Sequence, residues 1–250
     1  VTDLVSAQRM AAWGDVARRI AHEIKNPLTP IQLSAERLRR KFSPLVGDEA
    51  ESLGELTGVI VRQTGDLRRI VDEFSKFARM PEPERRNADM TALLRDAVLL
   101  QQSAFPDLTI TASLPKEALP LDIDPTLVSQ AIVNLIKNAG EAIESLTERG
   151  VPEGFRGEIR VTATVAEDHV EIGIADNGIG LPDDVSRLFE PYVTTRDKGT
   201  GLGLPIVRKI IEEHDGAMRL EAAEPFADGA HSGAKAVIVL PLGPSSRVAA

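Results

Sequence analysis

The sequence predicts an α+β protein with two domains, an N-terminal antiparallel helical hairpin and a C-terminal α/β sandwich. Three observations lead to this prediction. Apolar residues between positions 4 and 77 recur at steps of three and four, as on the buried stripe of a helix. A polar segment with two prolines, positions 80 to 87, then interrupts the pattern. Beyond it, alternating strand-like segments are interleaved with helical ones, which is typical of helices layered on one sheet.

The composition is that of a globular protein with a substantial core. The 250 residues are 42% hydrophobic, carry a net charge of −9 and include no cysteine. The acidic balance argues against a general nucleic-acid surface, and the lack of cysteine excludes disulfides and thiolate metal sites. No apolar run approaches the ~20 residues that span a bilayer, and no signal peptide is visible. The opening VTDLVSAQRM reads as helix, so we expect a fragment of a longer receptor.

The first helix is predicted over positions 4 to 42, with one apolar stripe. At about 100° per residue, His22 lies about 200° around the axis from the stripe residue two positions before it. Lys25 and Asn26 fall on the same exposed side. Pro27 removes a backbone donor and is expected to bend the helix. The imidazole should therefore be exposed, opposite a stripe made of Val16, Ile20, Ile24, Leu28, Ile31, Ala35, Leu38 and Phe42.

The second helix carries a near-strict heptad with one polar layer, Gln63. The link at positions 43 to 48 is short enough for an antiparallel hairpin. A two-helix hairpin buries too little apolar surface alone, so we expect two copies to pair into a dimeric four-helix bundle. The alternative is a hairpin packed on its own second domain. The heptad consists of Leu53, Leu56, Ile60, Gln63, Leu67, Ile70, Phe74 and Phe77.

The domain bounds and the elements of the sandwich follow from these patterns. The predicted division is a hairpin at 1–80, a linker at 81–87, the sandwich at 88–243 and a tail at 244–250. Pro125 is a favourable first-turn residue for a long helix. The sandwich elements are predicted as helices at 90–102, 125–146 and 204–213, and as strands at 108–112, 158–165, 169–176, 217–222 and 234–240, with the second and third strands as neighbours.

One predicted strand places a carboxylate in the interior. Asp176 ends the strand and, at a period of two, shares an apolar face with Ile172 and Ile174. A buried carboxylate costs several kcal/mol unless a partner meets it. The glycines of the following turn, Gly178 and Gly180, allow a ligand to approach closely. This arrangement suits recognition of the exocyclic amine of adenine, and the alternative is a strand-end turn capped by the aspartate.

Two further segments suit a nucleotide with its metal. The long helix carries Asn134 and Asn138 one turn apart, with Glu141 on the same face, and amide oxygens suit Mg²⁺. The alternative is a polar helix face in water. The run GTGLGL at 199–204 leads into a helix opened by Pro205, and backbone donors at a helix N-terminus suit polyphosphate. It is not a Walker A loop, and the alternative is a glycine-rich surface loop.

Taken together, these motifs resemble those of sensor histidine kinases. HEIKNPLTP resembles their H-box, and HEIKNPLTPIQLSAERLRRK is similar to the nitrogen-regulation sensors of the NtrY type. NLIKNAGEAI resembles the N-box, and the segment 189–198 resembles the F-box with a mobile ATP lid. The resemblance covers about residues 6 to 241. It implies the ATP-binding fold that histidine kinases share with Hsp90, MutL and gyrase.

The resemblance also implies roles for single residues. It implies that ATP phosphorylates His22, that Glu23 assists the imidazole, and that Asn26 positions water for a phosphatase reaction. It implies that Asn138 binds Mg²⁺ and that Asn134 lines the phosphate side. The implied nucleotide-binding set is Asn134, Lys137, Asn138, Asp176, Gly178, Gly180, Phe189, Tyr192, Thr194, Thr195, Lys198, Gly199, Thr200, Gly201, Leu202, Gly203 and Leu204.

Partners and a location follow from the same resemblance. The phosphoryl group would pass to an aspartate of an NtrX-like response regulator receiver domain. The kinase would be a homodimer in the cytoplasmic portion of a bacterial inner-membrane receptor, attached to the membrane only through other segments.

Two other functions stay open, an ATPase of the Hsp90/MutL type and a nucleotide-sensing dimeric scaffold. Those ATPases carry a glutamate where this chain has Asn134, and the intact pair of His22 and Glu23 disfavours a scaffold. The remaining histidines, His169, His214 and His231, lack a metal-binding spacing, and His214 suits the end of a helix by its dipole alone.

Overall fold

The computed structural model describes residues 2–78, 82–151, 154–190, 193, 201–226 and 233–243. The chain divides into two compact units, Val1–Pro81 and Glu82–Ala250.

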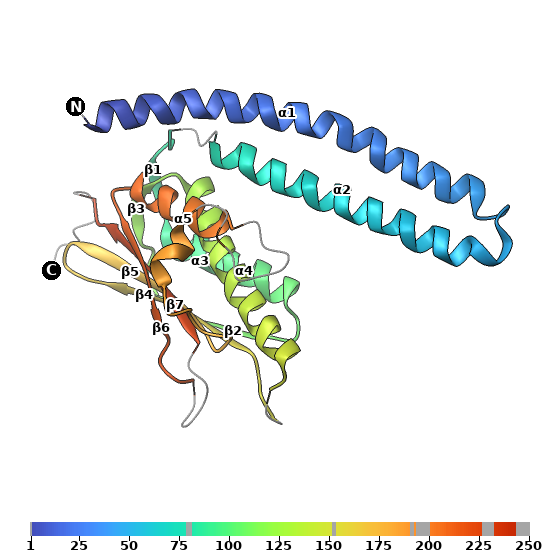
Figure 1. Cartoon of the computed structure of the whole chain (residues 1–250). Coiled ribbons are helices and arrows are strands. Elements are labelled where there is room, and N and C mark those ends of the chain that lie inside the picture. Colours follow the sequence, from blue (N-terminus) through green and yellow to red (C-terminus); the bar gives the residue numbers. More distant parts are fainter. Residues whose placement is uncertain are drawn as a thin grey trace. The chain divides into compact units, whose positions relative to one another are not determined.

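The first unit is an antiparallel hairpin of two long helices. Helices α1 (Thr2–Phe42) and α2 (Ala50–Ala78) run side by side, joined through the short 3-10 helix η1 (Gly47–Glu49) (Figure 1). Pro27 and Pro30 both lie inside α1, which continues past them as one gently curved helix. The bend expected at Pro27 is therefore accommodated without a break.

The contact between the two helices is a narrow seam with a seven-residue repeat. Its residues are buried, and both threonines donate a hydrogen bond from Oγ1 to a backbone carbonyl one turn earlier, at 2.7 Å for Thr57 and 2.8 Å for Thr64. A two-helix contact covers only such a strip, because each helix presents one row to its partner. We define the seam as Ala21, Leu28 and Ala35 of α1 with Thr57, Thr64 and Val71 of α2.

The single apolar stripe predicted for the first helix is thus split. Leu28 belongs to the seam, whereas Ile24, Ile31 and Leu38 remain 40%, 45% and 46% exposed in the single chain. The stripe is wider than the seam, as expected for a hairpin that buries too little apolar surface alone. On α2, Ile60 and Leu67 are exposed in the same way.

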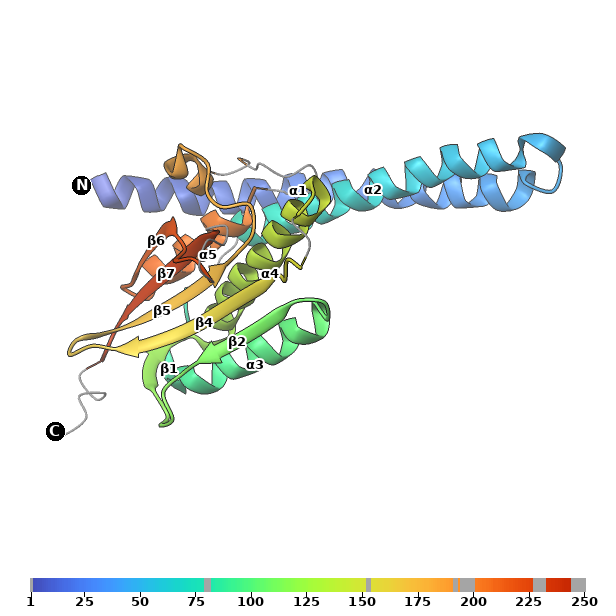
Figure 2. The same ribbon diagram turned by 90° about the horizontal axis from the view of Figure 1, so that it is seen from below.

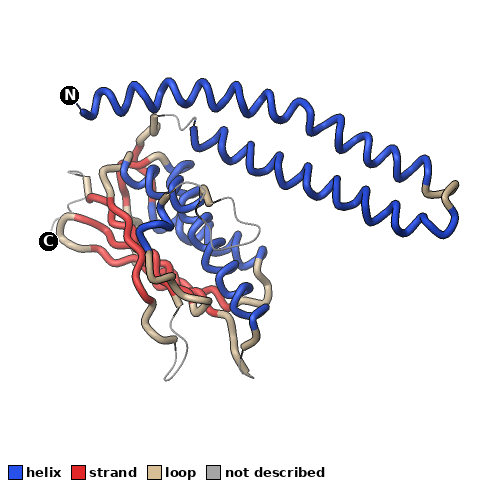
Figure 3. The backbone as a smooth tube through the Cα atoms, in the orientation of Figure 1, coloured by secondary structure: helices blue, strands red, loops and turns tan. Residues whose placement is uncertain are grey.

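The second unit is a layer of helices on a five-stranded sheet, which confirms the predicted α/β sandwich. The strand order is β2-β4-β5-β7-β6, with β2 and β4 parallel and the other neighbours antiparallel (Figure 2). The helices cover one face of the sheet, so that helices and strands form separate layers in Figure 3. The elements are α3 (Met90–Ala104), α4 (Pro125–Arg149), α5 (Gly203–Glu212), β2 (Thr109–Ser113), β4 (Glu158–Val165), β5 (His169–Asp176), β6 (Ala217–Ala222) and β7 (Ala234–Pro241).

In the second unit, two short strands and one short helix were not predicted. Strands β1 (Arg86–Asp89) and β3 (Pro120–Ile123) pair antiparallel in a separate two-stranded sheet, and η2 (Val185–Phe189) is a 3-10 helix. Arg86 and Asn87, which the sequence assigned to the linker, belong to β1. Each of these strands has only four residues, which is too few for an alternating pattern to stand out.

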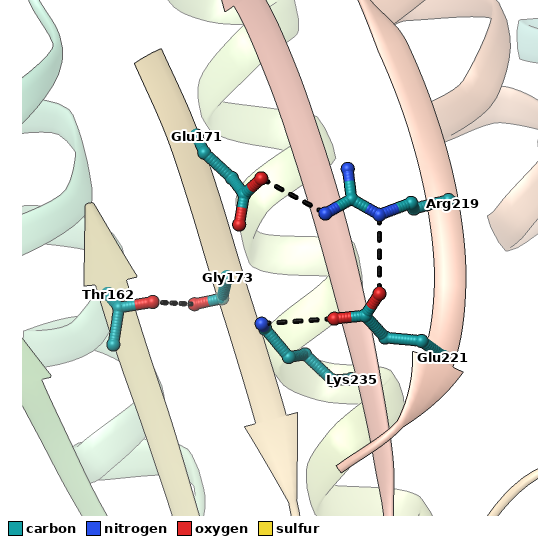
Figure 4. A network of polar contacts seen from close by, with 6 residues as sticks. All are labelled: Thr162, Glu171, Gly173, Arg219, Glu221 and Lys235. Carbon is teal, nitrogen blue, oxygen red and sulfur yellow. Dashed lines mark hydrogen bonds and ion pairs between the residues drawn. The ribbon is translucent and has the colours of Figure 1, made fainter. Parts of the chain in front are cut away.

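The face of the sheet that points away from the helices carries a network of paired charges (Figure 4). The guanidinium of Arg219 contacts Glu171 at 3.0 Å and Glu221 at 3.2 Å, and Lys235 contacts Glu221 at 3.0 Å. The network joins β5, β6 and β7, and the hydrogen bond from Lys235 contributes most to lowering the pKa of Glu221. Partly exposed pairs of this kind stabilise weakly. The apolar core lies instead between the sheet and the helices.

Replacing Gly65 of α2 by alanine should stabilise the hairpin by about 0.5–1 kcal/mol, because a glycine inside a helix costs that much relative to alanine. A Cβ added at Gly65 meets no atom within 4 Å. Urea denaturation followed by circular dichroism measures the effect. The control Gly173→Ala, whose Cβ would lie 2.7 Å from Thr162 Oγ1, should lower stability. An unchanged midpoint for Gly65→Ala would contradict this prediction.

Candidate functional site

The side chains of His22, Glu23 and Asn26 are exposed on α1, which confirms the predicted exposure of the imidazole. Lys25 was placed on the same exposed side, but its side chain is only 30% exposed and forms an ion pair with Asp72 of α2. The first unit therefore presents the histidine to solvent beside a charged contact between its two helices.

In the second unit, the carboxylate of Asp176 is buried at the end of β5. Ile172, Ile174 and Asp176 are 0%, 2% and 5% exposed, as the period of two predicted. Asp176 Oδ1 accepts hydrogen bonds from the backbone N–H of Gly178 at 2.9 Å and of Ala234 at 3.4 Å. These backbone donors offset part of the cost of burying a carboxylate and fix its position.

The turn after Asp176 packs directly on α4. A Cβ at Gly178 would lie 2.6 Å from the carbonyl carbon of Ala142 and 2.7 Å from the backbone nitrogen of Ile143, so only glycine fits. The N–H of Ile179 donates to the carbonyl of Ala142 at 3.3 Å. Gly180 has a φ of +77°, in the left-handed region that favours glycine. Both glycines of the predicted motif are thus required by backbone geometry.

Asn177 is a structural residue that the sequence reasoning did not single out. It is buried, its Oδ1 accepts from the N–H of Glu158 at 2.8 Å, and its Nδ2 donates to the carbonyl of Arg156 at 2.8 Å. These bonds join the end of β5 to the start of β4. The signal available in the sequence was its place inside the motif, with a side chain on the opposite face from Asp176.

Helix α4 brings the predicted amide face next to the glycine loop. Asn134 and Asn138 are half-buried, whereas Lys137 is exposed. The Lys137 Nζ lies 3.6 Å from Oε1 of Glu141. A Cβ built on Gly203 would lie 3.7 Å from Asn138 Nδ2 and 3.9 Å from its Oδ1. The Asn138 amide therefore lies close to the first residue of α5.

Part of the glycine loop and of the lid can be placed. Gly201 has a φ of +67°, Leu202 is fully buried, and Leu204 is half-buried in the first turn of α5. Phe189 ends η2 with the Arg208 guanidinium 5.2 Å from its ring centre. The predicted site residues outside the described part of the chain are Tyr192, Thr194, Thr195, Lys198, Gly199 and Thr200.

The first turn of α4 is anchored by Asp124. Its Oδ1 accepts from the N–H groups of Thr126 at 2.9 Å and Leu127 at 3.1 Å, which caps the helix, and its Oδ2 accepts from the N–H of Glu84 at 3.0 Å. The N–H of Asp124 itself donates to His214 Nε2 at 2.9 Å. This one residue thus joins α4 both to the segment before β1 and to the end of α5.

His214 lies just past the end of α5, as expected, and it also bonds to the start of α4. Its side chain is buried, and Nδ1 donates to the carbonyl of Ile210 at 2.7 Å while Nε2 accepts from Asp124. In these bonds Nδ1 carries the hydrogen that is donated, and Nε2 supplies the lone pair that accepts. Next to it, Arg85 forms an ion pair with Asp215 at 2.6 Å. The contacts hold α4 and α5 together at the ends remote from Asn138 and Gly203.

In the part of the chain that the structure describes, no group of three or more His, Cys, Asp or Glu side chains is arranged to hold a metal ion. No described helix is long and apolar enough to cross a membrane.

Comparison with known families assigns both units. Residues 12–83 match the His Kinase A (phospho-acceptor) domain, and residues 123–244 match the family of histidine kinase-, DNA gyrase B-, and HSP90-like ATPases. The chain belongs to the sensor histidine kinases.

Within that family, it is similar to sensors of nitrogen regulation. It is 53% identical to the nitrogen regulation protein NtrY of Azorhizobium caulinodans over 226 residues, which are 89% of this chain and 28% of that protein. It is 40% identical to an NtrY-like sensor histidine kinase of Rickettsia conorii over 229 residues, 91% of this chain and 36% of that protein. The chain thus spans about a third of the length of these relatives.

Solved structures show the same fold. The histidine kinase ThkA in complex with the response regulator protein TrrA matches 96% of this chain and 65% of that chain, with a TM-score of 0.64 and 26% identity. Full-length ShkA in complex with AMPPNP matches 91% of this chain and 45% of that chain, with a TM-score of 0.67. Its 22% identity supports the fold alone.

Asp124 should make the stability of the second unit depend on pH. Desolvation, the largest single effect, raises its pKa, but the N–H groups of Leu127, Glu84 and Thr126, with His214 nearby, together hold the pKa below its usual value. A pKa that is lower in the folded state adds stability above the unfolded value of about 3.9, and this contribution is lost as the pH falls through the folded pKa.

We therefore expect Asp124→Asn to lower the free energy of unfolding by about 1–2 kcal/mol near pH 7, because an amide cannot accept at both oxygen positions. The difference from wild type should shrink below about pH 4. Urea denaturation at several pH values measures it, with Asp122→Asn on the exposed side of β3 as the control. A difference that stays constant down to about pH 3 would contradict this role of the charge.

Proposed function

We propose that this chain transfers the γ-phosphoryl group of ATP to His22. The observation that carries the proposal is the exposure of the His22 imidazole on α1, within the region that matches the phospho-acceptor domain. A buried imidazole could not meet a triphosphate, whereas this one is open to it. Glu23, the next residue, is also exposed.

The second unit supplies a site that fits an adenine nucleotide. The buried Asp176 carboxylate suits the exocyclic amine of adenine, and Gly178 and Gly180 shape the turn that packs on α4 directly after it. Asn138 and Asn134 suit the phosphate side of α4, with Asn138 as the magnesium ligand. Magnesium held there would neutralise charge on the phosphates as the phosphoryl group departs.

The rest of the nucleotide site is proposed by position. Lys137 precedes Asn138 on α4 and is exposed, and Phe189 and Leu202 lie on either side of the loop in sequence. The backbone at Gly201 and Gly203 and the first turn of α5 at Leu204 suit phosphate oxygens, because the N–H groups at a helix N-terminus lack partners within the helix. The proposed set is completed by neighbours of this loop in sequence that lie outside the described residues, namely Tyr192, Thr194, Thr195, Lys198, Gly199 and Thr200.

The chemical step uses neutral histidine as the nucleophile. The unprotonated ring nitrogen of His22 attacks the γ-phosphorus, a P–N bond forms, and the P–O bond to ADP breaks with its electron pair leaving on ADP. Glu23 accepts the hydrogen bond from the other ring nitrogen and stabilises the positive charge that develops there. Little covalent work is left to other residues, so positioning supplies most of the rate.

The partner proposed for the phosphorylated protein is a response regulator. The solved complex of ThkA with TrrA pairs a kinase of this fold with such a partner, and the similarity to NtrY favours an NtrX-like regulator. A receiver aspartate would accept the phosphoryl group. By the same similarity, we place the chain in the cytoplasmic portion of an inner-membrane receptor.

A homodimer is proposed from the apolar surface of the hairpin. Ile24, Ile31 and Leu38 of α1 and Ile60 and Leu67 of α2 are each at least 40% exposed in the single chain. Large apolar side chains that line one side of a hairpin are best buried by a second copy in a four-helix bundle.

The rival ATPase function is disfavoured by Asn134. An amide at this half-buried position cannot act as a base toward water, in contrast to the glutamate of the Hsp90/MutL type. A phosphatase activity toward the regulator is favoured by Asn26, because its amide is exposed one turn beyond His22 and can orient a water molecule.

Replacing His22 by glutamine should abolish transfer of label from γ-labelled ATP and leave nucleotide binding unchanged, because only the acceptor is lost. Acid-labile label on the protein and fluorescence titration with an ATP analogue measure the two properties. The matched variant Asp176→Asn should lose both nucleotide binding and labelling. Labelling of His22→Gln at the wild-type level would refute the assignment.

Replacing Asn26 by alanine should slow dephosphorylation of the regulator by about a hundredfold, the lower end of the range for a positioned side chain that assists proton transfer. Autophosphorylation should change less than threefold or so, since the nucleophile is intact. Regulator labelled in advance, incubated with each variant, gives the rate. Thr29→Ala, one turn further on the exposed side of α1, is the control. Equal rates for Asn26→Ala and wild type would remove this role.

A further inference from the structure

Lys25 lies between the hairpin seam and the imidazole. At about 100° per residue, Lys25 is about 40° around α1 from the seam residue Ala21, and His22 is about 100° around in the same direction. Asp72 follows the buried seam residue Val71 on α2, and its carboxylate forms the ion pair with Lys25. Both charged groups are therefore held beside the packed contact, next to the proposed phosphorylation site.

The ion pair is of a kind that a stronger anion can displace. The side chains of Lys25 and Asp72 are 30% and 44% exposed, so water competes for the contact. An ammonium on a four-carbon stem can turn between two acceptors, and residues three apart on a helix are neighbours. A phosphoryl group on His22 would bring about two negative charges to that neighbouring position. A dianion binds a cation more strongly than a single hydrated carboxylate does.

We propose that Lys25 is a positioning residue that stabilises phosphorylated His22, and that Asp72 is the counter-ion that holds it in the unphosphorylated protein. The proposal rests on phosphorylation of His22. Phosphorylation moves the Lys25 ammonium from α2 to its own helix, and it releases a charged contact between α1 and α2 at the level of the modified residue. The alternative is that the same ion pair only stabilises the packing of α1 against α2.

The equilibrium between His22 with ATP and phosphohistidine with ADP measures this stabilisation directly. The extent of labelling is followed to equilibrium at fixed ratios of ATP to ADP, with magnesium, in the whole chain. Lys25→Gln should lower the equilibrium constant about three- to tenfold, because a charge-assisted contact to the phosphoryl group is lost. Asp72→Asn should raise the equilibrium constant about two- to fivefold, because Lys25 no longer has to break an ion pair with Asp72 before it contacts the phosphoryl group.

A double variant separates a direct contact from general electrostatics. In Lys25→Gln/Asp72→Asn, the second change should have no further effect, since Asp72 acts through Lys25. The control is Asp66→Asn, which removes the 2.8 Å pair of Asp66 with Arg69 elsewhere on α2 and should leave the equilibrium unchanged. Thermal unfolding of each variant reports the loss of any stabilising contact between α1 and α2.

Two results would overturn the proposal. In the first, Lys25→Gln and Asp72→Asn shift the equilibrium in the same direction or not at all, and both lower the thermal stability equally. The ion pair would then only stabilise the packing of α1 against α2. In the second, the effects of the two substitutions on the equilibrium constant add in the double variant, which would mean that Asp72 acts independently of Lys25. Both results require that His22→Gln abolishes labelling of the protein. If labelling persists in His22→Gln, the proposed function itself fails.

Discussion

The packing of the β5 turn on helix α4 is the constraint on which the nucleotide site depends. Gly178 allows the turn to reach the backbone of Ala142, and no other residue fits there. The buried carboxylate of Asp176 is held just before this contact by backbone donors. Asn138 lies one turn before Ala142 on the same helix, beside Gly203. One helix thus fixes the carboxylate, the amide and the edge of the glycine loop relative to one another.

The hairpin separates its two surfaces by the geometry of its seam. Ile24 lies about 60° around α1 from Ala21 in one direction, and His22 lies about 100° in the other. The apolar side chains therefore gather on one side of the seam, and His22 and Lys25 lie on the other. A second copy can cover the apolar side and leave the imidazole accessible, so the proposed dimer is compatible with the proposed phosphoryl transfer at the same helix.

What the sequence could predict is what local periodicity determines. The bounds of β4, β5 and β6, the burial of Asp176 and the exposure of His22 all follow from spacing within one element. The hydrogen bond from Asp124 to His214 could not be predicted, because the two residues are 90 positions apart and meet only through the packing of α4 and α5. The seam was missed for a related reason, since periodicity reveals an apolar stripe but not which partner covers each part of it.

Mass spectrometry under alkaline conditions that preserve phosphoramidates can map the phosphorylated residue. After incubation of the chain with ATP and magnesium, we expect a phosphoryl group on the imidazole of His22. Phosphate on a different residue, or release of free phosphate with an unmodified protein, would contradict this expectation.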